Sequence, residues 1–213
     1  MPLLTLNRRF ALTAMAAAGV LGTLPAAAAE LPRDTSATAR QLVRWATETG
    51  DHQGLPFAVI DKPAARIHVF SAQGQWLSSA PVLLGAALGD RSAPDIGQRP
   101  LSQIRPEERT TPAGRFVTEP GRNLRGDDIV WIDYESAVSL HRVRSVHAAE
   151  RRQQRLASRG VSDKRISYGC VNAPEAFYNQ FIAPVFGQAR GVVYVLPDTE
   201  PFATFFIAAN SYP

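Results

Sequence analysis

The spacing of apolar residues changes along the chain, and each change marks a different kind of secondary structure. Residues 34–50 carry apolar side chains at helical spacing, which predicts a helix that Gly50 ends. Its apolar face consists of Leu42, Trp45 and Ala46. Residues 174–186 show the same period and predict an amphipathic helix. Its inward face consists of Phe177, Phe181, Ile182 and Val185. The charged segment 148–158 is typical of a solvated helix or an ordered insertion.

Seven short runs rich in β-branched and aromatic residues are predicted to be strands. They span 57–61, 66–70, 76–84, 116–118, 129–134, 138–143 and 191–196. Lys62-Pro63 and Gln73-Gly74 separate the first three runs, which is typical of successive hairpins. Residues 86–110 have no period and predict a long loop, of a length that is often functional or mobile. The fold class is therefore predicted to be mainly β with a few helices.

The first 29 residues are typical of an export signal of the Sec or the Tat type. Arg8 and Arg9 form a charged start, and the apolar run 10–24 is short for a membrane span. The alanines that follow resemble a cleavage site, which we place after Ala29. We therefore expect export to the periplasm, in the cell envelope, with no transmembrane anchor after cleavage.

Removal of this signal leaves 184 residues, which suffice for one domain with a full core. We assign 30–55 to an N-terminal helix and linker and 56–213 to the main domain. The formal net charge falls from +4 to +2 when Arg8 and Arg9 leave with the signal. The remaining basic residues are spread along the sequence, which argues against a nucleic-acid partner.

Cys170 is the only cysteine of the chain, so it has no internal disulfide partner. In an oxidising compartment such a thiol is either buried and inert or kept free for chemistry. It stands in the motif Ser167-Tyr168-Gly169-Cys170-Val171-Asn172, downstream of His141. A nearby imidazole makes a thiol partly ionised at neutral pH. His141 follows residues 137–140, in which apolar and polar side chains alternate. This pattern predicts a buried strand that holds the imidazole ring rigidly. We therefore predict Cys170 as the nucleophile and His141 as the general base.

Three landmarks in this order resemble the YkuD-type L,D-transpeptidase catalytic domain. They are Thr111-Pro112-Ala113-Gly114-Arg115-Phe116, His141 at the end of a strand, and Ser-x-Gly-Cys-Val-Asn at 167–172. The resemblance covers about residues 56–197 and makes 56–213 an L,D-transpeptidase-like catalytic domain. It implies a two-sheet β core with flanking helices and no cofactor. It also implies attack on the bond between the third residue and D-Ala of a peptidoglycan stem peptide, with an amine acceptor resolving the thioester on Cys170.

The residues beside Cys170 are candidates for oxyanion binding and for holding the loop. Gly169 lets the backbone turn sharply, so that amide groups near Tyr168 and Gly169 can face a developing oxyanion. Ser167 either orients the loop and accepts a proton or caps a turn. Asn172 either places a substrate carbonyl or stabilises the loop.

The sequence departs from the family pattern at several positions, and these departures bear on the acceptor site more than on the acyl-enzyme step. Arg142 stands where glycine is usual, Tyr168 replaces the usual histidine, and Asn172 stands where arginine is common. The interval of 29 residues between His141 and Cys170 is also longer than usual. Four arginines near His141 either bind a stem-peptide carboxylate or belong to a solvated insertion helix: Arg142, Arg144, Arg151 and Arg152.

The other histidines are weaker candidates. His147 is the alternative base, because its interval of 23 residues to Cys170 is closer to the usual spacing. His68 is expected to point outward from a strand, and His52 lies in a predicted linker. No set of histidines has zinc-ligand spacing, so no metal site is expected.

Two other functions remain open beside transfer. Water in place of the amine would make the protein an L,D-carboxypeptidase or an amidase that releases a peptidoglycan-linked lipoprotein. A non-catalytic peptidoglycan-binding module is the third possibility, but it has no reason to keep both His141 and Cys170. In papain-like peptidases the cysteine precedes the histidine, and here the order is reversed.

Overall fold

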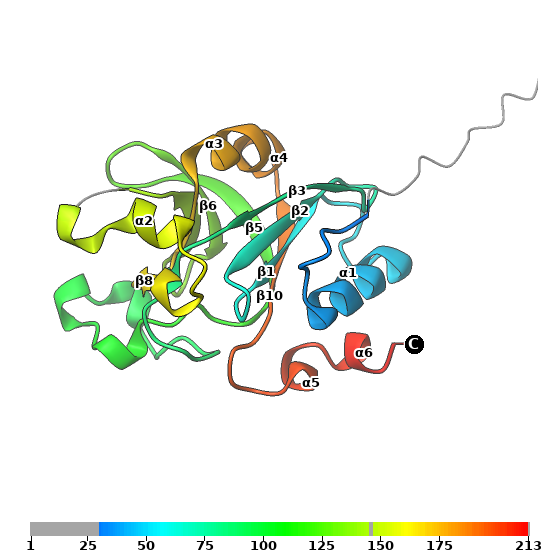
Figure 1. Cartoon of the computed structure of the whole chain (residues 1–213), viewed down its shortest axis with the longest axis horizontal. Helices are drawn as coiled ribbons and strands as arrows, with labels where there is room; N and C mark the ends of the chain where they lie inside the picture. The colour runs from blue at the N-terminus through cyan, green and yellow to red at the C-terminus, as the bar shows by residue number, and fades with distance from the viewer. Residues whose placement is uncertain (1–29, 145–146, 213) are drawn as a thin grey trace, which may run out of the picture.

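The computed structural model describes residues 30–144 and 147–212, and strands dominate this part of the chain (Figure 1). The strands are β1 (Phe57–Asp61), β2 (Arg66–Phe70), β3 (Trp76–Pro81), β4 (Leu84–Gly85), β5 (Gly114–Arg122), β6 (Asp128–Asp133), β7 (Val138–Arg142), β8 (Arg165–Ser167), β9 (Val171–Ala173) and β10 (Gly191–Val195). The α-helices are α1 (Ala37–Thr49), α2 (Arg152–Ala157), α3 (Glu175–Phe177), α4 (Ala183–Phe186), α5 (Phe202–Phe205) and α6 (Ile207–Asn210). The predicted export signal lies outside the described residues.

Eight strands form one large sheet in the order β3-β2-β1-β10-β5-β6-β7-β9, and β4 and β8 form a small second sheet. Most neighbours are antiparallel, but β1 pairs with β10, β7 with β9 and β4 with β8 in parallel. The two predicted hairpins between β1, β2 and β3 are confirmed. The predicted fold class, mainly β with flanking helices, is also confirmed.

Strand β5 belongs to both halves of the large sheet. Its first five residues, 114–118, pair with β10. Its last four residues, 119–122, pair with β6. One strand therefore joins the half that carries β1 to β3 to the half that carries β6, β7 and β9.

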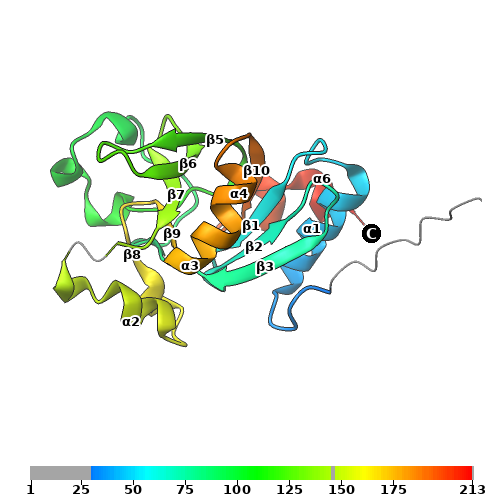
Figure 2. The same cartoon turned by 90° about the horizontal axis from the view of Figure 1, so that it is seen from above.

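Both faces of the central strands are buried. Ala58 and Ile60 of β1 pack in one apolar cluster with α3 and α4, whereas Phe57 and Val59 pack in the other with α1 and α6. Figure 2 shows these helices on opposite sides of the sheet. Strands buried on both faces have continuous apolar runs rather than alternation, as in 57–60 and 192–195.

The helices begin and end close to the predicted boundaries. The Ser36 hydroxyl accepts a hydrogen bond from the amide of Ala39 at the start of α1, and Gly50 ends the helix with a φ of 69°. The predicted helix 174–186 is present as α3, a π-helical turn (Tyr178–Ile182) and α4. Residues 86–110 form a long loop, as predicted, with three single 3-10 turns. The short strands β8 and β9 and the C-terminal helices α5 and α6 were not predicted.

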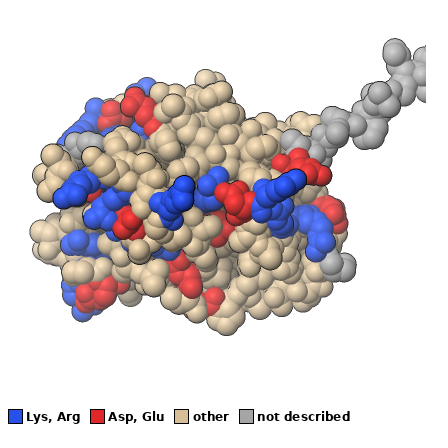
Figure 3. All heavy atoms as spheres, in the orientation of Figure 1, with Lys and Arg blue, Asp and Glu red and all other residues tan. Residues whose placement is uncertain are grey.

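Basic and acidic side chains are intermixed on the face of the molecule in Figure 3. None of the helices within residues 30–144 and 147–212 combines the length and the apolar character that crossing a membrane requires.

His68 corrects one prediction, because it points into the protein rather than outward. Its side chain is fully buried, and its Nδ1 lies 2.7 Å from the Ser79 hydroxyl. Alternation fails here because α1 covers the face of β2 that a solvated sheet would expose. Burial lowers the pKa of His68 to about 4, and Arg66 also lowers it, against the opposing effect of Asp61.

Titration of His68 predicts a loss of stability in mild acid. An unfolded chain binds the proton at its ordinary pKa of about 6.5, whereas native His68 resists protonation down to a pH of about 4. Neutral His68 therefore contributes fully to the free energy of unfolding above about pH 6.5. This contribution falls by up to about 3 kcal/mol as the pH drops toward 4. We expect His68→Gln, which does not titrate, to lack this loss. Urea unfolding of both proteins across this pH window measures it, and parallel pH profiles would contradict it.

Candidate active site

The predicted base and nucleophile lie on neighbouring strands. In the parallel pair of β7 and β9, His141 is opposite Asn172, and Cys170 directly precedes β9. Figure 2 shows the two strands side by side. A parallel pair needs a crossover connection, and here that connection includes α2 and β8. This crossover brings together two residues that are 29 positions apart in the sequence.

Polar groups of β7 and of the preceding turn surround the Cys170 thiol. Sγ lies 3.5 Å from both the amide nitrogen and the hydroxyl oxygen of Ser139, and 3.6 Å from the carbonyl oxygen of Ala137. Burial raises the pKa of the Cys170 thiol, but His141 and the two Ser139 donors lower it more, so the pKa lies below its ordinary value. The site therefore favours the thiolate.

The sequence reasoning missed Ser139. A signal for it was available, because residues 139 and 141 of a strand share one face of the sheet. A serine two positions before the base was therefore a candidate neighbour of the sulfur.

A backbone carbonyl fixes the tautomer of His141. Nδ1 lies 2.7 Å from the carbonyl oxygen of Arg142, which can only accept a hydrogen bond. The neutral ring therefore carries its proton on Nδ1 and has its acceptor lone pair on Nε2. The lone pair on Nε2 gives His141 the form that a general base requires.

The turn before Cys170 has a conformation that requires glycine. Gly169 has a φ of 135°, and a Cβ there would lie 2.8 Å from the carbonyl oxygen of Thr110. The Ser167 hydroxyl accepts from the Gly169 amide at 3.1 Å and donates to the Cys170 carbonyl at 2.6 Å. Of the two roles that the sequence left open for Ser167, the structure has it as the cap of this turn.

The side chain of Tyr168 is exposed and lies against the long loop. The guanidinium of Arg109 lies 4.1 Å from the centre of its ring. This contact links the end of the 86–110 loop region to the cysteine motif.

Asn172 is fully buried and bridges the site. Its Nδ2 lies 3.2 Å from the carbonyl oxygen of Cys170 and 3.4 Å from Nε2 of His141. Its Oδ1 accepts a hydrogen bond of 2.6 Å from Arg152, which is also paired with Glu150. Of the two predicted roles for Asn172, these contacts fit that of holding the loop.

Arg142 and Arg144 are two of the four arginines that are candidates for substrate binding, and both have acidic partners. Arg142 pairs with Asp128 at 2.7 Å, and Arg144 pairs with Asp127 at 2.5 Å. His147, the alternative base, is exposed and stands at the start of a 3-10 turn (Ala148–Glu150). His141 is the side chain that most lowers the pKa of Cys170.

A cavity of about 720 Å³ lies at the turn before β7. Its wall includes Ala137, whose carbonyl oxygen contacts Sγ. The residues lining it come from 92–98 of the long loop, from Trp131 and from 134–137. A side chain at Gly97 would collide with the carbonyl oxygen of Glu135, so this glycine lets the loop approach the hairpin between β6 and β7.

Within the described parts of the chain, no group of three or more His, Cys, Asp or Glu side chains is arranged to hold a metal ion.

No protein-family model matches the sequence, and no curated protein matches it. Solved structures do match the fold. An L,D-transpeptidase in complex with imipenem is 19% identical with a TM-score of 0.37, and the match covers 66% of this chain and 58% of that one. The L,D-transpeptidase from Mycobacterium smegmatis is 16% identical with a TM-score of 0.35, and the match covers 66% and 58%. The catalytic domain from the E. faecium L,D-transpeptidase is 18% identical with a TM-score of 0.33, and the match covers 68% and 98%.

All three are L,D-transpeptidases. The chain spans 58% of the length of the first two structures.

The contacts of the thiol predict which histidine activates it. His141→Ala removes the group that most lowers the pKa of Cys170, so alkylation by iodoacetamide at neutral pH should slow by about tenfold or more. His147→Ala is the matched control and should react like the wild type. Because the chain has one cysteine, intact mass spectrometry reads the reaction of Cys170 alone. The assignment is wrong if His147→Ala slows alkylation and His141→Ala does not.

Proposed function

We propose that this protein is an exported L,D-transpeptidase that transfers acyl groups between peptidoglycan stem peptides through a thioester on Cys170. The observation that carries the proposal is the Cys170 thiol itself. It has a lowered pKa and lies beside Ser139. His141 presents the lone pair of Nε2, and the Ala137 carbonyl that contacts Sγ belongs to a residue in the wall of a cavity. These are the features of an activated nucleophile with its base.

The first step forms the thioester. Nε2 of His141 takes the thiol proton, and Sγ attacks the carbonyl carbon between the third residue and D-Ala of the stem. The carbonyl oxygen becomes anionic and accepts hydrogen bonds from the backbone amides of Tyr168 and Cys170. We assign this role to them because the Gly169 amide is already bonded to Ser167. The protonated His141 then gives its proton to the leaving amine of D-Ala.

The second step resolves the thioester. An amine acceptor attacks the carbonyl carbon while His141 takes a proton from it, and Sγ leaves as the thiolate. Asp95 and Glu135 line the cavity, and their carboxylates attract a cationic acceptor, which gives one proton to water before its neutral amine attacks.

Loss of the nucleophile should abolish the reaction without loss of the fold. Cys170→Ser removes one polarisable atom and little volume, so circular dichroism should match the wild type. Disaccharide tetrapeptides incubated with the wild type should release D-Ala and form cross-linked or exchanged products, which mass spectrometry detects. The variant should form none. Release of D-Ala by Cys170→Ser would refute the assignment, and release by the wild type without transfer products would identify a hydrolase.

Carbapenems should acylate the same thiol. The strained lactam carbonyl is open to attack by a thiolate, and the ring-opened product stays attached to sulfur. Intact mass spectrometry should show one adduct on the wild type and none on Cys170→Ser. If iodoacetamide labels Cys170 but a carbapenem does not, the cavity does not accept an acyl donor of this shape.

A further inference from the structure

Lys62 is fully buried, and its ammonium group donates to three acceptors. Nζ of Lys62 donates to the carbonyl oxygen of Gly89 at 2.7 Å, to Asp90 at 2.8 Å and to the carbonyl oxygen of Thr111 at 2.6 Å. A buried charge of this kind is costly unless every partner is in place. The position of the Thr111 backbone is therefore set by a cation that cannot move without losing its bonds.

The anion of this pair is equally fixed. Asp90 accepts hydrogen bonds from the amides of Asp198, Thr199 and Glu200, which follow β10. Burial alone raises the pKa of Asp90, but the bonds from Lys62 and these amides lower it far below its ordinary value, so Asp90 is ionised.

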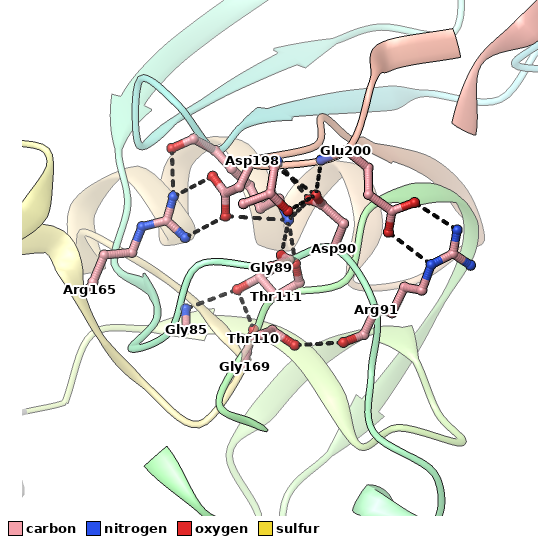
Figure 4. A network of polar contacts seen from close by, with 12 residues as sticks. Gly85, Gly89, Asp90, Arg91, Thr110, Thr111, Arg165, Gly169, Asp198 and Glu200 are labelled. Atoms are coloured by element: carbon pink, nitrogen blue, oxygen red, sulfur yellow. Dashed lines mark hydrogen bonds and ion pairs between the residues drawn. The ribbon is translucent and has the colours of Figure 1, made fainter. Parts of the chain in front are cut away.

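Arg165 extends the network to the strand that leads into the cysteine motif. It stands at the start of β8 and donates two hydrogen bonds to Asp198, which also lies 3.5 Å from Nζ of Lys62. The charged cluster of Lys62, Asp90, Asp198 and Arg165 therefore joins four segments of the chain (Figure 4).

Thr111 connects this charged cluster to the turn that carries the nucleophile. Its side chain is fully buried. Its hydroxyl accepts a hydrogen bond from the amide of Gly85 at 2.9 Å and donates one to the carbonyl of Gly169 at 2.8 Å. Gly169 is the residue directly before Cys170, and its α-carbon packs against the carbonyl of Thr110. The backbone on one side of the thiol is thus held by Thr111, and Ser139 and His141 lie on the other side.

We propose that Thr111 is a positioning residue for the nucleophile: its hydroxyl, held in place by the buried Lys62 and Asp90 pair, fixes the turn at Gly169 and so sets the distance of Sγ from Ser139 and His141. The inference rests on the proposed function only in taking Cys170 as the nucleophile. Loss of the hydroxyl leaves two buried backbone groups, the Gly85 amide and the Gly169 carbonyl, without their partner. The turn then relaxes, and the thiol loses the geometry that favours the thiolate.

The neighbouring threonines allow a matched test. Thr111→Val removes the hydroxyl and keeps the shape, and Thr111→Ser restores the hydroxyl. Thr110→Val is the control, because the Thr110 hydroxyl donates to the carbonyl of Arg91, whereas its contact with Gly169 is made by the backbone carbonyl, which the substitution keeps. For each protein, the rate of iodoacetamide alkylation is measured across pH, which gives the apparent thiol pKa of Cys170.

The expected outcome is a shift of the pH profile with Thr111→Val alone. Its apparent thiol pKa should rise, its alkylation at neutral pH should slow about tenfold, and kcat for transfer should fall by roughly 10- to 100-fold with little change in KM. Thr111→Ser should recover most of the rate, and Thr110→Val should match the wild type. A wild-type pH profile for Thr111→Val would overturn the proposal, and so would an equal shift for Thr110→Val.

A second variant protects the test against misfolding. If Thr111→Val is recovered unfolded, Thr111→Ala, which opens space instead of burying a methyl group against the Gly85 amide, carries the same expectation. Alkylation needs no peptidoglycan, so the positioning role stands or falls independently of the proposed substrate. A protein that fails to release D-Ala but shows the Thr111 shift would refute the proposed function and keep the inference.

Discussion

The parallel pairing of β7 with β9 is the constraint on which the candidate site depends. Backbone hydrogen bonding between these strands places His141 opposite Asn172 and holds Cys170 at the entrance of β9. The spacing between adjacent strands therefore sets the separation of His141 and Cys170. The remaining polar contacts refine this arrangement: Ser139 approaches the sulfur from β7, and Ser167 closes the turn from the other side.

Much of the fold was predictable because its signals are local. The apolar face of α1 and its Gly50 end, and the hairpins of β1 to β3, follow from residue spacing within a few positions. The short strands β8 and β9 were not predictable, because each has three residues and exists only through pairing with a distant strand. The burial of His68 was missed for a related reason: a strand pattern does not say whether a helix covers its second face.

The sequence predicted the reactive groups of the site but not the buried residues that hold them in place. The motif around Cys170 and the strand ending at His141 identify a thiol and a base, since both depend on residue type and order. The cluster that holds Thr111 is different. Lys62 follows a strand, so the sequence indicates a turn residue. Its contacts with Asp90 and Thr111 span 28 and 49 positions. No local pattern encodes contacts of that range, so only the folded chain reveals them.

The shared strand β5 has a consequence for how the molecule responds to stress. Because residues 114–118 pair with β10 and residues 119–122 pair with β6, the same nine residues are structural for both halves of the sheet. Fraying of one half withdraws a pairing partner from the other, so the halves share one cooperative unit. Strand β7, which carries the imidazole, and β9, which follows the thiol, contribute buried residues to the same core, so the candidate site has no independent hinge in β5.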